Sequence, residues 1–382
     1  MQSDILDDEK DLLLKIRMMR LHWWTNHFVT HDVNLYNFDI AQGRRDTYTD
    51  IDVICINFNS MLQKRIIICD CKSGNTIKEK NRIFWLSGLM NIIDIDDCYF
   101  VKTDIAHNQV YQLADKTNIR LISDKLLSNL EKIFNVNEDE YIGPFDIKNI
   151  ENINKIYKSL KKNHYKEYLY FSDLYWYDDL YSQIKKLYEI MQKIKSYGYK
   201  EGGYAEKDIV NHYLIFYILS LFSISCLEFA NKLIFVEKEK QNDYIYDCLI
   251  RGNPYIVQNI DIYTKFYNFM VGEIKTRYGK KYPISKKEFL SFLKIGYLDN
   301  IIDLIQRIGN YSLFASSLPQ IFQLAAYDLF NSKDKFNWDY IPNINNMEKT
   351  KKLVNDFLVF LIREKIIESK NYENYISFFN IE

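Results

Sequence analysis

Two carboxylates and one ammonium group lie on two apolar segments that are close together in the sequence. Asp52 lies within the run of residues 51–56, and Asp70 and Lys72 follow the run of residues 65–69. Both runs are rich in β-branched residues, which favours two strands joined as a hairpin. Side chains alternate between the faces of a strand, so Asp70 and Lys72 share one face. A hairpin of this kind brings the three groups into one pocket and predicts hydrolytic chemistry.

The cysteines and histidines near this hairpin are predicted to be structural. Cys69 and Cys71 alternate with Asp70, so they occupy the opposite, buried face, where a free cysteine behaves as a small apolar residue. His22, His27 and His31 have no zinc-motif spacing and are interpreted as structural.

The elements that position the hairpin alternate between helices and strands. A helix is expected over residues 5–30, followed by a turn-rich stretch and the two strands. Helices are expected next over residues 78–93, 108–116 and 126–134, with strands at 98–101 and 119–122 between them. This order predicts an α/β domain with a mixed sheet flanked by helices.

The second half of the chain is predicted to be an all-α domain. We place the first domain at residues 1–138, a polar linker with Gly-Pro at residues 139–151, and the helical domain at residues 152–382. The uncharged run at residues 209–227 has nearly the length of a membrane span. It carries Asn211, His212 and serines, so a buried core helix is favoured and no membrane is expected.

Charge and motifs limit the functions open to the chain. The formal net charge is -1, so contact with nucleic acid requires a local patch. Lys158, Lys161 and Lys162, with Tyr157 before them and Tyr165 after them, form such a patch or a solvated helix face. The sequence has no P-loop, dinucleotide-binding or GxSxG motif. Six unpaired cysteines and no secretory signal favour a cytoplasmic protein.

Asp52 and the Asp70-Cys71-Lys72 segment, placed on two successive predicted strands, resemble the PD-(D/E)xK, or restriction-endonuclease-like, nuclease superfamily. The later strand, helix and strand through Ser123 resemble the second half of that family's core. The resemblance covers residues 1–135 and implies a restriction-endonuclease-like fold there.

The resemblance also implies a site. Asp52 and Asp70, with the backbone carbonyl of Cys71, would bind Mg²⁺ or Mn²⁺, and Lys72 would orient or activate the attacking water. Glu9, on the first helix, is a further candidate ligand. Three arginines are candidates for binding phosphate: Arg44, Arg45 and Arg82.

The expected function is a metal-dependent nuclease, with DNA favoured over RNA, in a role such as restriction or anti-phage defence. The helical domain would select the substrate, sense a trigger, or bind a partner protein or a second copy. The alternatives are a catalytically inactive nuclease-like scaffold for nucleic acid or protein, and a helical interaction protein in which the motif is accidental.

Overall fold

The structure is a computed structural model of the chain. It describes residues 2–39, 44–74, 78–92, 95–104, 108–136, 142–194, 207–251, 254–279 and 298–381.

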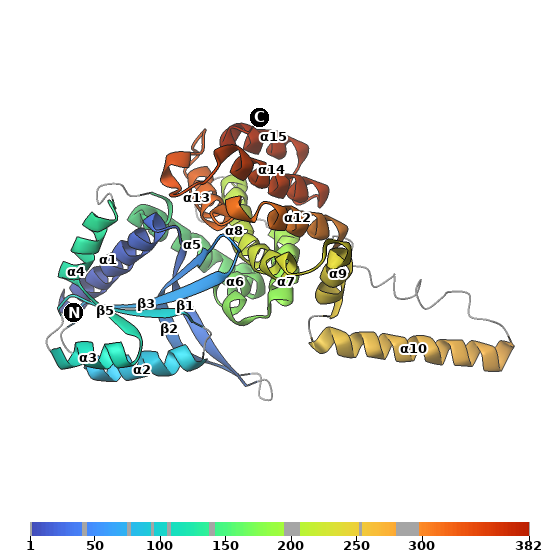
Figure 1. The fold of residues 1–382 in the computed structure, drawn as a ribbon, viewed down its shortest axis with the longest axis horizontal. Coiled ribbons are helices and arrows are strands. Elements are labelled where there is room, and N and C mark those ends of the chain that lie inside the picture. The colour runs from blue at the N-terminus through green and yellow to red at the C-terminus, as the bar shows by residue number, and fades with distance from the viewer. Residues whose placement is uncertain are drawn as a thin grey trace.

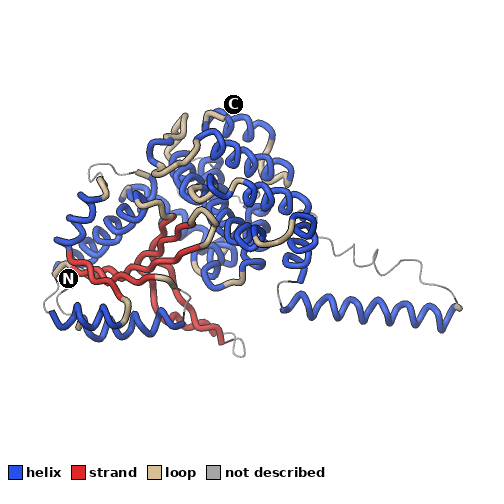
Figure 2. The backbone as a smooth tube through the Cα atoms, viewed as in Figure 1, coloured by secondary structure: helices blue, strands red, loops and turns tan. Residues whose placement is uncertain are grey.

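A five-stranded mixed sheet forms the centre of the N-terminal part (Figure 2). The first three strands are antiparallel, and the third, fourth and fifth are parallel. Their order in the sheet follows the sequence: β1 Phe28–Asp39, β2 Arg44–Phe58, β3 Lys64–Lys72, β4 Asp97–Lys102 and β5 Ile119–Ser123. The prediction of a mixed sheet is therefore confirmed.

Helices cover both faces of this sheet. In Figure 1, α1 (Gln2–Trp24) and α4 (Asp124–Ile133) lie on one face, and α2 (Glu79–Ile92) and α3 (Asn108–Lys116) lie on the other. α4 begins at Ser123, whose side chain accepts a hydrogen bond from the Leu126 amide and so caps the helix.

The prediction of a helix over residues 5–30 is wrong at its C-terminal end, and β1 was not predicted. The helix ends at Trp24, and Asn26 adopts a left-handed conformation with φ of 67°. In β1, Asp32 has φ of 55° and lies between the residue pairs His31–Val53 and Val33–Ile51. This irregularity interrupts the alternation of apolar and polar residues that reveals a strand in sequence.

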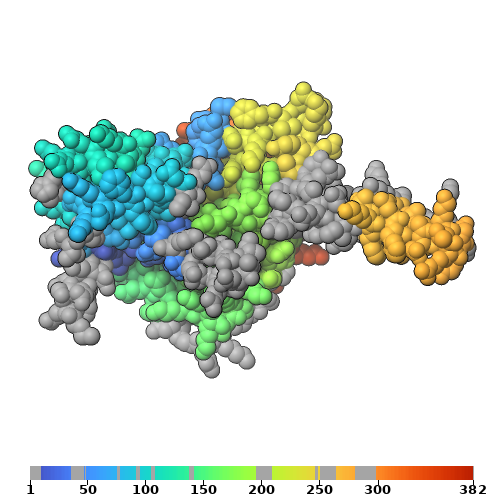
Figure 3. Space-filling view, turned by 90° about the horizontal axis from the view of Figure 1, so that it is seen from below, coloured from blue at the N-terminus to red at the C-terminus, as the bar shows by residue number. Residues whose placement is uncertain are grey.

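The C-terminal region is mostly helical, as predicted. Its described α-helices are α5 Ile147–Asn163, α6 Tyr165–Ser172, α7 Leu180–Ile194, α8 Lys207–Ile234, α9 Gln241–Arg251, α10 Pro254–Tyr278, α12 Leu298–Asn310, α13 Leu318–Phe330, α14 Met347–Arg363 and α15 Ser369–Phe379. The orange helix α10 extends away from the body in both views (Figures 1 and 3).

Helix α8 lies at the centre of this region. The part from Ile209 to Ile234 is long and apolar enough to cross a membrane, but 94% of its most apolar window is buried inside the protein. It packs against α13, α7 and α12. Its apolar composition is therefore explained by a core position.

The helical region binds the free edge of β1. The side chain of Gln323 in α13 donates a hydrogen bond to the Val29 carbonyl (2.6 Å) and accepts one from the Val29 amide (3.5 Å). Further along the strand, Asp173 accepts a hydrogen bond from the Asn34 amide (3.1 Å), and the Tyr177 hydroxyl donates one to the Asn34 carbonyl (2.7 Å). These side chains satisfy backbone groups that an edge strand leaves unpaired.

The described part of the segment predicted as a linker, from residue 142 on, packs against the N-terminal part of the chain. Gly143–Phe145 form a buried turn of 3₁₀-helix, and α5 already begins at Ile147 rather than at residue 152. The Phe145 ring lies edge-on to that of Trp23, with 5.4 Å between the ring centroids. One continuous apolar core includes buried residues from both the N-terminal and the helical part. The division of the chain into two domains therefore stays a prediction.

Candidate active site

Asp52 and Asp70 lie side by side where two strands separate. The residue pairs that join β2 to β3 run from Phe58–Lys64 to Val53–Cys69. Asp52 and Asp70 are the next residues beyond the last pair, and both are buried, with 2% and 4% of their surfaces exposed. Burying two ionisable carboxyl groups is costly unless they are paired, so their partners decide what this site can do.

Lys72 joins the two carboxyl groups. Its Nζ atom lies 3.0 Å from Asp52 Oδ2 and 3.7 Å from Asp70 Oδ1. The backbone amide of Cys71 donates a second hydrogen bond to Asp52 Oδ2, at 2.8 Å. The structure thus brings together Asp52, Asp70 and Lys72, the three residues that the sequence pattern selected.

Arg82 is the basic residue of α2 that reaches the site. It donates two hydrogen bonds of 2.6 Å to Asp70, from Nε to Oδ2 and from Nη2 to Oδ1. Its guanidinium carbon lies 3.8 Å from the centroid of the Trp85 ring. The planar group is therefore held between a carboxylate and an aromatic face, as guanidinium groups at binding sites often are.

Lys15, on α1, is a site residue that the sequence reasoning missed. Its Nζ atom lies 2.9 Å from Asp52 Oδ1 and 2.6 Å from Asp32 Oδ1. Only 14% of its side chain is exposed. The same helix is fixed to the end of β3 because the Ser73 amide donates a hydrogen bond to Asp11. No local motif marks Lys15, since its partners lie on β1 and β2.

Burial and charge separate the titration of the two carboxyl groups. Burial alone would raise the pKa of Asp52, but Lys15 and Lys72 outweigh burial and lower it. Burial does raise the pKa of Asp70, because Arg82 and Lys72 oppose it only in part. Burial alone would lower the pKa of Lys72, but the charges of Asp52 and Asp70 outweigh the effect of burial and raise this pKa. Lys72 is therefore an ammonium donor at neutral pH.

The donor set fits a hard divalent cation. Asp52 Oδ1 is buried and, despite its ion pair with Lys15, accepts no hydrogen bond of good geometry from the described residues. Carboxylate oxygens such as those of Asp52 and Asp70 are the ligands that Mg²⁺ and Mn²⁺ prefer. The predicted role of the Cys71 backbone carbonyl stays a prediction.

The other predicted residues fall into two groups. The side chains of Glu9, Arg44 and Arg45 lie outside the described residues. The lysines of the predicted patch are exposed on α5: Lys158, Lys161 and Lys162. Tyr157, which precedes Lys158, packs against the apolar core. The nucleic-acid patch stays a prediction.

Replacing Lys15 by methionine is expected to lower the free energy of unfolding by about 2 kcal/mol at pH 7, because Asp52 stays buried with less compensating charge. Asp52 has a lowered pKa, so its contribution to stability is full above its ordinary pKa and is lost as the pH falls. The deficit should therefore shrink below about pH 4. Denaturant unfolding of the variant and the wild type, at pH 7 and at a pH below about 4, measures this deficit.

The control for this experiment is Lys116→Met, which removes an exposed lysine at the end of α3. It should change the stability by less than about 0.5 kcal/mol. An equal loss in both variants, or a Lys15→Met deficit that does not change with pH, would contradict the role given to Lys15.

No family model matches the chain, and no curated protein and no solved structure is similar to it. The interpretation of the site rests on the geometry of its side chains.

Proposed function

We propose that the chain is a metal-dependent nuclease that hydrolyses phosphodiester bonds, with DNA as the favoured substrate. One observation carries the proposal: two buried carboxylates on adjacent strands share the ammonium group of Lys72. A surface salt bridge would not need a second buried carboxylate, and an apolar core would avoid both. The resemblance to the PD-(D/E)xK pattern supports the same chemistry.

The proposal assigns a distinct task to each group. Asp52 and Asp70 would hold Mg²⁺ or Mn²⁺, which would supply Lewis-acid activation of the scissile phosphate and of the attacking water. Lys72 remains protonated and donates to the attacking water or to a phosphate oxygen as negative charge develops there.

Two further cations complete the site. Arg82, whose side chain is 24% exposed, is available to contact a phosphate from the side of α2. Lys15 keeps Asp52 ionised from the side of α1. A restriction or defence role would be compatible with such a site, but it rests on the resemblance alone.

The test is cleavage by the full-length chain of plasmid DNA, linear DNA, single-stranded DNA and RNA, with Mg²⁺, Mn²⁺ or EDTA. We expect cleavage that requires the metal, is abolished by EDTA and falls at least about 100-fold in Asp70→Asn, because that variant loses a metal ligand. The control is Lys116→Ala, an exposed lysine of α3 that should leave the rate unchanged.

Cleavage that survives both EDTA and Asp70→Asn would overturn the proposal. Tight binding of nucleic acid without cleavage in either metal would favour the alternative, an inactive nuclease-like scaffold.

A further inference from the structure

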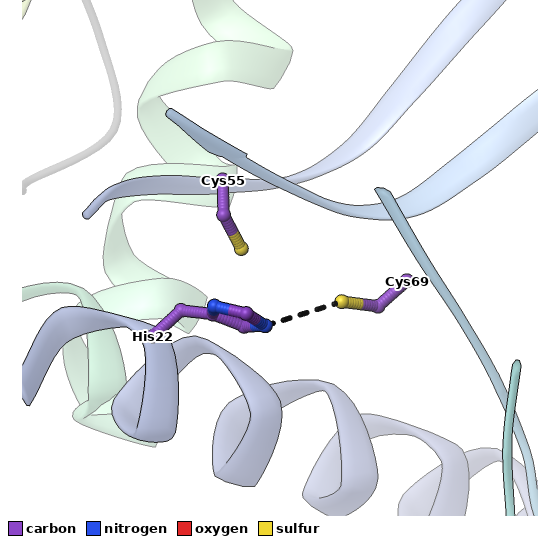
Figure 4. Close-up of side chains that lie close together, drawn as sticks. All are labelled: His22, Cys55 and Cys69. Atoms are coloured by element: carbon purple, nitrogen blue, oxygen red, sulfur yellow. Dashed lines mark hydrogen bonds between the residues drawn. The ribbon is translucent and has the colours of Figure 1, made fainter. Parts of the chain in front are cut away.

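Three side chains with metal-binding atoms meet inside the core, where α1 packs against β2 and β3. They are His22 of α1, Cys55 of β2 and Cys69 of β3 (Figure 4). A ligand atom of each lies within 4.8 Å of those of the other two. All three residues are buried, with 4%, 0% and 1% of their surfaces exposed. We call them the His-Cys-Cys cluster.

The spacing of the cluster is close to that of a zinc site. His22 Nε2 lies 3.8 Å from Cys69 Sγ. With Zn–S and Zn–N bonds of about 2.3 and 2.0 Å in a tetrahedron, ligand atoms lie about 3.5 to 3.8 Å apart. Since all three ligand atoms lie within 4.8 Å of one another, movements of about 1 Å or less would bring them onto one ion.

The protein leaves the His22 imidazole poorly satisfied. Among the described residues, its buried Nδ1 atom has no hydrogen-bond partner, and its Nε2 atom lies against the Cys69 thiol. A thiol is a weak hydrogen-bonding group, so burying a polar ring in this way is unfavourable. A metal ion bound to Nε2 would replace this weak contact with a stronger one, since binding an ion is a stronger interaction than a hydrogen bond to a thiol.

Aromatic rings enclose the imidazole. The Tyr99 ring is stacked on that of His22 at 5.3 Å between centroids, and the His27 ring lies edge-on to it at 5.0 Å. His27 is itself held by contacts from its Nδ1 to the His22 carbonyl and to the Thr25 hydroxyl. The cluster is thus enclosed within the core, away from bulk solvent.

We propose that the His-Cys-Cys cluster binds Zn²⁺. Thiolate and imidazole ligands select soft or borderline ions and disfavour Mg²⁺. Two thiolates, one neutral imidazole and Zn²⁺ also sum to zero charge, whereas Cu⁺ would leave a net negative charge in the core. Three protein ligands leave the fourth position of a tetrahedral ion for a water molecule.

The ion would fasten α1 to two strands at once. Cys55 lies three positions after Asp52, and Cys69 immediately precedes Asp70. The zinc site would therefore fix the distance between the helix that carries Lys15 and the strands that carry the carboxylates. This inference does not depend on the proposed nuclease function.

The experiment measures metal in the full-length chain, purified without a histidine tag under reducing conditions and dialysed against metal-free buffer. We expect about one Zn²⁺ per chain and at least a roughly 10-fold loss of zinc in Cys55→Ser and in Cys69→Ser. Replacement by Co²⁺ should give the near-ultraviolet absorption of a thiolate–cobalt bond. This readout uses the wild-type chain, so it does not depend on whether the variants fold.

Two controls separate this site from others. Cys226→Ser, at an equally buried position on α8, should keep its zinc. Asp70→Asn should also keep it, which excludes binding at the carboxylates. A wild-type chain that takes up neither Zn²⁺ nor Co²⁺ would overturn the proposal, and so would zinc that persists in both cysteine variants. A Cys55–Cys69 disulfide in the protein as isolated from cells would overturn it too.

Discussion

The Lys72→Met variant is expected to cleave nucleic acid at least about 100-fold more slowly than the wild type, within the range found for positioned proton-transfer groups. Methionine keeps most of the side-chain volume of lysine but removes its charge. The Lys72 ammonium lies within 4 Å of both carboxylates, so it is placed to donate to a group held between them. Rates at saturating Mn²⁺ measure the effect, with Lys116→Met as the exposed control.

The affinity for the metal distinguishes this role from a structural one. Removing Lys72 takes a positive charge away from Asp52 and Asp70, so Mn²⁺ should bind as tightly as in the wild type or more tightly. Asp70→Asn should instead lose Mn²⁺ affinity. A Lys72→Met variant that is slow only because it no longer binds Mn²⁺, or that is as active as the wild type, would contradict the assignment.

A Lys72→Arg variant adds a further check. Arginine keeps the charge, but its guanidinium group is planar and larger than an ammonium group. Between two buried carboxylates there is little room for the change, so we expect arginine to restore less than about one tenth of the rate. Full recovery would mean that charge alone matters at this position.

The sequence was sufficient for the centre of the site because that part is local. Asp52, Asp70 and Lys72 lie on two consecutive strands, and the alternation of side chains along a strand decides which of them can meet. Arg82 lies ten positions after Lys72, on α2, and it was a candidate only through the resemblance to the nuclease family. The two buried strands are recognisable because β-branched residues dominate them.

Contacts between distant segments could not be predicted in this way. Lys15 is on the first helix, 17 positions from Asp32, and its role becomes visible only when the helix packs against the sheet. The His-Cys-Cys cluster has ligands from three elements and no motif spacing, so its histidine was interpreted as structural. β1 was missed because the backbone at Asp32 breaks the strand pattern.

In the helical region, too, local features could be predicted and contacts between distant segments could not. The uncharged run of residues indicates where α8 lies in the sequence. It does not indicate which helices pack against α8. The hydrogen bonds between Gln323 and Val29 join residues 294 positions apart. A glutamine within an apolar helix carries no signal that its amide will pair with the edge of a sheet.

Residues 1–138 expressed alone are expected to be insoluble or to lack a cooperative unfolding transition, because the helical region covers surfaces that cannot be left exposed. The free edge of β1 would lose the side-chain partners of Val29 and Asn34, and an unpaired edge strand is prone to aggregate. Trp23, which is fully buried, donates a hydrogen bond from Nε1 to the Tyr340 carbonyl and would lose both its cover and this partner.

The matched experiment expresses residues 1–138 alone and together with residues 139–382 as a separate chain. Coexpression should restore soluble material, because the second fragment supplies the missing contacts without a covalent link. Soluble yield, size-exclusion chromatography and thermal unfolding by circular dichroism measure the outcome. If the first fragment alone is monomeric and unfolds cooperatively, the two parts are independent domains, and the edge contacts of β1 contribute far less than about 1 kcal/mol each.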